Sequence, residues 1–210
     1  MSKIWFTSDP HFGHYNIISL CGRKIFNDLP GGLHPGYMSR KEVIEEMDSL
    51  LIRNWNEKVN PQDEIYCLGD FAFYNKSKKE NIIKQLNGIK YLVRGNHDSG
   101  DDAWWISQGF EWVKDYYNLR VHDVFLSKEL TIHQYHQQIV LCHFPILSWE
   151  QMHHGSWHLH GHCHGNIQER NKNICRMDVG VDTNNLYPYE YEEIKNRMIN
   201  ALNVPVDHHK

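Results

Sequence analysis

The chain has 210 residues, enough to bury one substantial hydrophobic core, so we expect a single domain over residues 1–210 with a frayed tail at 204–210. The net charge of −4 excludes a bulk basic surface that would attract nucleic acid or a membrane. The five cysteines include no CxxC pair, which argues against a zinc finger or a disulfide framework and favours a reducing compartment. The N-terminal apolar run is too short for a signal peptide, and no stretch approaches a membrane span, so we expect a soluble, cytoplasmic protein.

The first half of the chain alternates strand-like and helix-like segments. Short apolar runs predict buried strands at 3–8, 64–68 and 89–93, and apolar residues at helical spacing predict helices over 39–55 and 77–88. Both helices begin with a capping-box pattern, Ser39 with Glu42 and Ser77 with Glu80. This strand–helix–strand–helix–strand order implies right-handed crossovers and a largely parallel sheet.

The second half has a different pattern. Its predicted elements are a short helix at 101–108, antiparallel strands within 110–140 with turns near Asn118 and Ser127–Lys128, strands at 138–142, 157–160 and 174–181, and a final helix over 189–202. Residues 21–37 are rich in Gly and Pro and predict an irregular loop. The charged side chains of this loop, among them Arg23, are either solvated or able to reach a substrate.

A polar motif follows the predicted strand at 89–93. It reads Arg94-Gly95-Asn96-His97-Asp98. Asn96 can offer an amide oxygen to a cation, His97 can transfer a proton, and Asp98 can hold the His97 imidazole in one tautomer. Gly95 permits the sharp turn that would put these groups in a cleft. Taken alone, the motif is equally consistent with an ordinary strand-to-loop turn.

Five apolar runs deliver metal-ligand residue types just past their carboxyl ends. These residues are Asp9 and His11, Asp70, Asn96 and His97, His143, and His162 and His164. In open α/β sheets, ligands bind outside those carboxyl ends. Imidazole, carboxylate and amide ligands together suit Mn, Fe or Zn, and seven ligands are too many for one tetrahedral ion. Two ions that share one carboxylate would supply a hydroxide near neutral pH for in-line displacement at phosphorus.

This ordered set resembles the motifs of the calcineurin-like metallophosphoesterase superfamily, and the resemblance spans nearly the whole chain. It implies a four-layer α/β/β/α sandwich of two mixed sheets flanked by helices, with two divalent ions, Mn favoured over Fe, Zn, Ni or Mg. The ligands that it implies are Asp9, His11, Asp70 and His164 for the first ion, and Asp70, Asn96, His143 and His162 for the second. His97 would be the general acid and Asp98 its partner.

Two departures from the superfamily narrow the expectation. Gly69-Asp70 continues as Phe71-Ala72-Phe73-Tyr74, unlike the acidic and Arg-bearing motif of the protein serine/threonine phosphatases, and Cys163 stands where many members have Thr. The segment 7–14 resembles a compact bacterial and phage branch of the superfamily.

We therefore expect a hydrolase of small phosphate esters, with diesters or nucleotides favoured over phosphoproteins. Alternatives are a metal-dependent nuclease, with nucleic acid only as substrate, and a non-catalytic metal-binding scaffold for protein partners. The chain has no excess of basic residues over acidic ones, which argues against the nuclease. Arg94 and His14 are candidates for substrate contact, with a structural salt bridge as the alternative for Arg94. His158 and His160 alternate with apolar neighbours, which favours packing within a strand.

Overall fold

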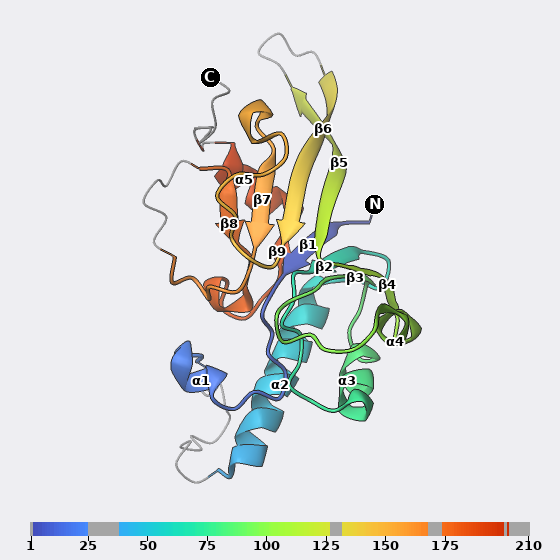
Figure 1. The fold of residues 1–210 in the computed structure, drawn as a ribbon, viewed down its shortest axis with the longest axis vertical. Helices are drawn as coiled ribbons and strands as arrows, with labels where there is room; N and C mark the ends of the chain where they lie inside the picture. The colour runs from blue at the N-terminus through green and yellow to red at the C-terminus, as the bar shows by residue number, and fades with distance from the viewer. Residues whose placement is uncertain (1, 25–37, 127–131, 168–173, 200, 202–210) are drawn as a thin grey trace.

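The computed structural model describes residues 2–24, 38–126, 132–167, 174–199 and 201, and contains two mixed β-sheets that share a core (Figure 1). In strand order, the first sheet consists of β4 (Phe110–Lys114), β3 (Ile89–Val93), β2 (Glu64–Cys67), β1 (Ile4–Thr7) and β9 (Tyr189–Glu190), and the second of β5 (Tyr116–Leu126), β6 (Ile132–Cys142), β7 (Trp157–His160) and β8 (Arg176–Asp178). Strands β1 to β4 are parallel and β9 is antiparallel to β1. In the second sheet β5 and β6 are antiparallel, while β6, β7 and β8 are parallel. The predicted α/β sandwich of two mixed sheets flanked by helices is confirmed.

Helices cover one face of the first sheet. They are α2 (Arg40–Lys58), α3 (Lys76–Ile83) and α4 (Asp102–Ser107), with the short α1 (Ile17–Leu20) beside them (Figure 1). Alternate strand residues such as Trp5 and Ile65 pack against the apolar stripe of α2, which includes Met47 and Leu51. The predicted capping box is present at the start of α2, where the Ser39 hydroxyl accepts from the Glu42 N–H and the Glu42 carboxylate accepts from the Ser39 N–H.

The face of the first sheet that points away from these helices packs against the second sheet, and this contact forms the second core. Phe6 and Leu68 from the first sheet lie in one cluster with Ile139 and Leu159 from the second. This core fixes the strands β1, β2, β6 and β7, whose side chains alternate between the two faces of each sheet. The residues that directly follow these strands are therefore held in fixed orientation at one end of the core. The position of the functional site therefore depends on both sheets.

Helix α5 (Tyr191–Met198) lies against the inner face of the second sheet. Its Tyr191 hydroxyl and Lys195 Nζ each lie 2.6 Å from the Asp123 carboxylate on β5, and the Tyr191 ring stacks on Trp157 of β7. The outer face of the same sheet is covered by the segment 144–156, which includes the 3-10 turn η2 (Met152–His154). Among the described residues, this segment with its 3-10 turn packs on the outer face of the second sheet.

Several predicted boundaries differ from the structure, each for a local reason. Helix α3 is capped by Asn75, whose side chain accepts from the Lys78 N–H, so the Ser77 capping box is wrong. Strand β4 joins the first sheet in parallel, and β5 runs without a turn through Asn118. The final helix begins at Tyr191 because Tyr189 and Glu190 pair with β1.

The predicted turn at Ser127–Lys128, most of the loop at 21–37 and the predicted frayed tail lie outside the described residues. Within those residues, every helix is too short or too polar to reach across a membrane.

His158 is fully buried on the outer face of the second sheet, as the alternation of its neighbours predicts. Its Nδ1 lies 3.1 Å from the Val140 carbonyl oxygen, and its Nε2 accepts from the Ile146 N–H. This pattern fits the neutral ring, and burial lowers the pKa of His158 to about 3.

The buried His158 should make stability pH-dependent. Because the unfolded chain binds a proton on this ring near pH 6.5 and the folded protein does not until about pH 3, the free energy of unfolding should fall by about 1.4 kcal/mol per pH unit between these values. Between pH 7 and pH 5, the free energy of unfolding of the metal-free wild type should therefore fall by about 2 kcal/mol more than that of the variant His158→Gln. Urea denaturation of both proteins at both pH values measures this difference. An equal loss in both proteins would contradict this account.

Candidate metal centre

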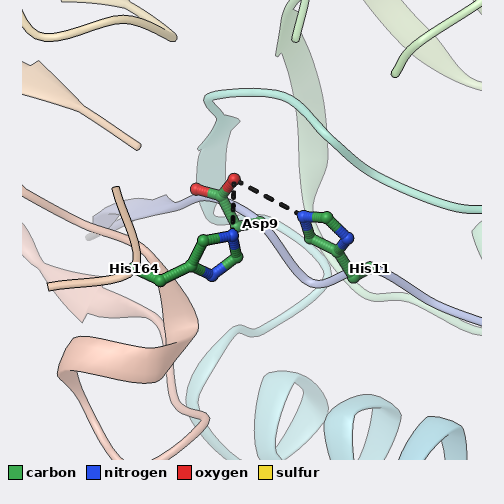
Figure 2. A group of neighbouring side chains, drawn as sticks. All are labelled: Asp9, His11 and His164. Atoms are coloured by element: carbon green, nitrogen blue, oxygen red, sulfur yellow. Dashed lines mark ion pairs between the residues drawn. The ribbon is translucent and has the colours of Figure 1, made fainter. Parts of the chain in front are cut away.

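The predicted ligands meet at one end of the two sheets. The first group combines Asp9 and His11, which follow β1, with His164, which follows β7 (Figure 2). Asp9 Oδ1 lies 3.7 Å from His11 Nε2 and 3.9 Å from His164 Nε2. These three ligand atoms lie within 4.8 Å of one another, a spacing that can hold a metal ion.

A second group lies beside the first and contains Asp70, His143 and His162. His143 Nε2 is 3.6 Å from Asp70 Oδ2 and 3.1 Å from the amide oxygen of Asn96. Asp70 Oδ2 also lies 3.6 Å from His11 Nε2, so one carboxylate oxygen contacts both groups. The structure thus brings all seven predicted ligands together, and Asp70 stands between the two groups.

The polar atoms of the first group fit a metal ion. Asp9 Oδ1 and His11 Nε2 are buried, and among the described residues neither has a hydrogen-bond partner. Buried polar atoms without partners are rare and costly, and a cation between them would satisfy both. Burial by itself would raise the pKa of Asp9, but the nearby imidazoles of His11, His143 and His164 hold it below the ordinary value, so the carboxylate is ionised and able to bind a cation.

Backbone strain concentrates at the same residues. Of the eight non-glycine residues with positive φ in the described part of the chain, five are predicted ligands: Asp9 (55°), His11 (52°), Asp70 (50°), His162 (69°) and His164 (48°). Such conformations cost on the order of 1–3 kcal/mol each and persist where the surrounding structure enforces them, commonly at functional sites. Local backbone strain therefore accompanies the inward orientation of these five side chains.

Two glycines let the ligand-bearing turns approach one another. A Cβ on Gly95 would lie 2.3 Å from Asp70 Oδ1, and a Cβ on Gly161 would lie 2.2 Å from Asp9 Oδ2. The first contact joins the turns after β2 and β3, and the second joins the two sheets. Asp9 Oδ2 also accepts from the His162 N–H across this junction.

Two of the histidines are held by a partner on the ring nitrogen that faces away from the site. His143 Nδ1 lies 2.7 Å from the Leu68 carbonyl oxygen, so Nδ1–H donates and Nε2 faces Asp70 with its lone pair. His164 Nδ1 lies 2.6 Å from Asp182 Oδ2. Burial alone would raise the pKa of Asp182, but the hydrogen bonds from His164 and Arg23 keep it below the ordinary value. A charged carboxylate of this kind orients a metal-binding histidine.

Arg23 supports the site from a buried position and does not project into solvent or toward a substrate. Its guanidinium pairs with both oxygens of Asp182 at 2.7 and 2.9 Å, and also donates to the carbonyl oxygens of Asp9 and Pro10. The sequence did not indicate a function for Asp182, and it left Arg23 as either a solvated charge or a substrate contact. The partners Arg23 and Asp182 are separated by 159 residues, so no local pattern indicates the pair.

Cys21, His164 and Asp182 form a further group with metal-ligand spacing. Burial and the charge of Asp182 raise the pKa of the Cys21 thiol to about 11, so it is protonated at neutral pH, whereas a metal binds the thiolate. Arg23 already occupies the oxygens of Asp182. In this group, Asp182 therefore holds His164 through its Nδ1, and the group is a poor candidate for a metal ion of its own.

The role predicted for Asp98 is wrong. Its carboxylate is buried and accepts from the backbone N–H groups of Asp70 (2.8 Å), Phe71 (2.9 Å) and Gly95 (2.9 Å). These bonds engage both carboxylate oxygens, and among the contacts of the described residues none joins Asp98 to the His97 imidazole. Asp98 instead fixes the turn after β2 to the turn after β3, and so fixes Asp70.

Arg94 is also placed differently from the prediction of substrate contact. It donates to the carbonyl oxygens of Asp98 and Gly100 and pairs with the carboxylates of Asp102 and Asp115. Its cationic donors are directed at the segment 98–102 and at Asp115, so the structural alternative is the one observed.

His97 and His14 both lie beside the ligands. The His97 side chain is 49% exposed, and its Nε2 is 4.0 Å from Asp70 Oδ2. His14 Nδ1 is 3.0 Å from His11 Nδ1, and the two rings stack. Both histidines are near enough to act on a molecule bound over the carboxylates.

Comparison with known proteins gives relatives along nearly the whole chain. The Uncharacterized protein MJ1445 of Methanocaldococcus jannaschii is 29% identical, and the match covers 97% of this chain and 98% of that protein. The Gene 66 protein of Mycobacterium phage L5 is 27% identical, over 87% of each chain. The crystal structure of AQ665 from Aquifex aeolicus, a protein of unknown function, has a TM-score of 0.58 and 24% identity over 93% of this chain and 99% of that one, which shows a shared fold. No family model matches the chain.

The position of Asp98 predicts that Asp98→Asn destabilises the fold. Hydrogen bonds to a charged acceptor contribute about 1.5–3 kcal/mol each, and the amide NH₂ would face a backbone N–H, so the free energy of unfolding should fall by about 2–4 kcal/mol. Urea denaturation of the metal-free protein measures this change. Asp101→Asn is the matched control, because Asp101 caps α4 and asparagine caps equally well. A variant at position 98 that is as stable as wild type would contradict the assigned role.

Proposed function

We propose that this protein is a phosphoric ester hydrolase of the calcineurin-like metallophosphoesterase type, with two divalent metal ions and small phosphodiesters or nucleotides as substrates. The observation that supports this proposal is the pair of His/Asp groups that share the single carboxylate of Asp70. Asp9, His11, Asp70 and His164 would hold the first ion, and Asp70, Asn96, His143 and His162 the second. The mixed nitrogen and oxygen donors favour Mn, with Fe, Zn, Ni or Mg as alternatives.

When bound, such an ion pair lowers the pKa of a coordinated water and neutralises charge on the phosphate oxygens. The reaction forms one P–O bond to the water oxygen and breaks the P–O bond to the leaving oxygen. The leaving oxygen needs a proton, and the chain must supply the donor.

His97 is the proposed donor. Its backbone N–H donates to Asp70 Oδ1 at 2.8 Å, which fixes the residue next to the shared carboxylate. Its half-exposed ring can reach a leaving oxygen above the ligands while remaining in exchange with solvent protons.

His14 is a proposed substrate contact. Its Nδ1 faces His11, so Nε2 is the atom left to donate to a phosphate oxygen. The ring stacks on Phe73 at 4.2 Å, which restrains its orientation. His14 would therefore add a directed hydrogen bond and take no part in proton transfer.

The proposal predicts that purified protein with added Mn²⁺ hydrolyses bis-(p-nitrophenyl) phosphate and that His97→Ala removes most of this rate while the metal content is unchanged. General acids contribute roughly 10²–10⁴-fold. The fold-loss in rate that His97→Ala causes should be larger for a methyl ester of phosphate than for the nitrophenyl ester. Methoxide needs a proton in order to leave, whereas nitrophenolate needs one much less. Initial rates on both esters and metal analysis of both proteins measure these effects.

The control is His136→Ala, which changes an exposed histidine on β6 and should keep the wild-type rate. A wild-type protein that binds metal but cleaves no mono- or diester would sink the proposal and favour a non-catalytic scaffold. Equal losses on the nitrophenyl and methyl esters would reject His97 as the proton donor while leaving the hydrolase proposal intact.

A further inference from the structure

An exposed phenyl ring lies beside the proposed proton donor. Phe73 is 39% exposed, and its ring centroid is 4.8 Å from that of His97, 4.2 Å from that of His14 and 5.0 Å from that of His11. The ring therefore contacts the proposed donor, the proposed phosphate contact and one metal ligand at once. Besides restraining His14, this ring could contact a bound substrate directly.

The exposure of Phe73 is fixed by the backbone. The Phe73 N–H donates to the Phe12 carbonyl oxygen at 2.8 Å, and Phe12 pairs with Ala72 in a β-bridge. The neighbouring Phe71 points the other way and is fully buried in the core. Single exposed apolar residues are common on protein surfaces, but this one is fixed through its backbone beside the candidate site, and aromatic side chains commonly line ligand sites.

A second exposed ring lies on the other side of Asp70. Phe144 is 44% exposed, and its centroid is 5.0 Å from that of His143 and 4.7 Å from that of His162. It contacts ligands of the second group and has no contact with His97 among those found in the structure. The two rings thus differ in one respect that matters here, because only Phe73 lies beside the group that would protonate the leaving oxygen.

A leaving group protonated by His97 must extend over or past this imidazole. The Phe73 ring offers an exposed apolar surface beside that imidazole, with 4.8 Å between the two ring centroids. A planar group attached to the leaving oxygen can stack on such a ring, which is worth about 1–3 kcal/mol per base, whereas a sugar or alkyl group of the same charge gains far less.

We propose that Phe73 is a specificity-determining residue, and that the site prefers phosphate esters whose leaving group is a nucleoside, with the base stacked on the Phe73 ring. This inference rests on the proposed function, because it takes His97 to mark the leaving-group side. The remainder of the substrate lies over the carboxylates and toward Phe144.

The test compares two probes that share a leaving oxygen and differ only in the base, adenosine 5′-monophosphate and ribose 5-phosphate. Each is measured as an inhibitor of bis-(p-nitrophenyl) phosphate hydrolysis by the Mn²⁺-loaded protein, and its binding is measured independently by calorimetry. Wild type should bind the nucleotide roughly 5–150-fold more tightly than the sugar phosphate, the factor that corresponds to one stacked base. Phe73→Ala should lose this preference by weakening the nucleotide much more than the sugar phosphate, which loses only the restraint on His14, and Phe73→Trp should retain the preference.

Two control variants separate stacking from general damage. Phe144→Ala should keep most of the preference, and Ile89→Ala, which truncates an equally exposed apolar residue at the start of β3, should keep all of it. Equal affinity of wild type for the two probes, or a Phe73→Ala variant that weakens both alike, would overturn the assignment of Phe73. A wild type without hydrolysis of any ester would instead mark failure of the proposed function.

Discussion

The position of one carboxylate decides whether this protein has a metal centre. Asp70 is held on four sides: its N–H donates to Asp98, its Oδ1 accepts from the His97 N–H, and its Oδ2 lies 3.6 Å from both His11 and His143. Its backbone adopts a left-handed conformation that an aspartate rarely takes. The buried Asp98 accepts from the N–H groups of Asp70 and Gly95, and so helps to hold this conformation between the two groups of candidate ligands.

The site also needs both sheets. Candidate ligands of the first group follow β1 and β7. Those of the second follow β2, β6 and β7, with Asn96 from the turn after β3 beside them, so both groups combine residues from the two sheets. Gly161 permits the approach, since a side chain there would collide with Asp9. Beside this contact between the sheets, Arg23 donates to Asp182, and Asp182 binds the His164 ring. The two residues thus hold His164 against the first sheet. Metal binding and the packing of the sandwich should therefore be coupled, because the unfolded chain has no preformed site.

Sequence patterns were sufficient for the fold and for bringing the candidate ligand residues to one end of the two sheets, because both depend on short local stretches of sequence. Strands such as 89–93 and 157–160 match the structure residue for residue, and each ligand follows a strand end in the order that a parallel arrangement requires. The roles of Asp98, Arg94 and Arg23 were not predictable in this way. Whether a carboxylate faces an imidazole or three backbone amides depends on a turn 27 residues away, and the partner of Arg23 is 159 residues distant. The exposure of Phe73 beside the buried Phe71 likewise depends on the bridge between Phe12 and Ala72.

The most direct measurement is anomalous diffraction from crystals grown with Mn²⁺. The account predicts two peaks about 3.5–4 Å apart, with the Asp70 carboxylate in contact with both, Asp9, His11 and His164 around one, and Asn96, His143 and His162 around the other. A single peak, or peaks remote from Asp70, would contradict the claim that this carboxylate joins two cation sites.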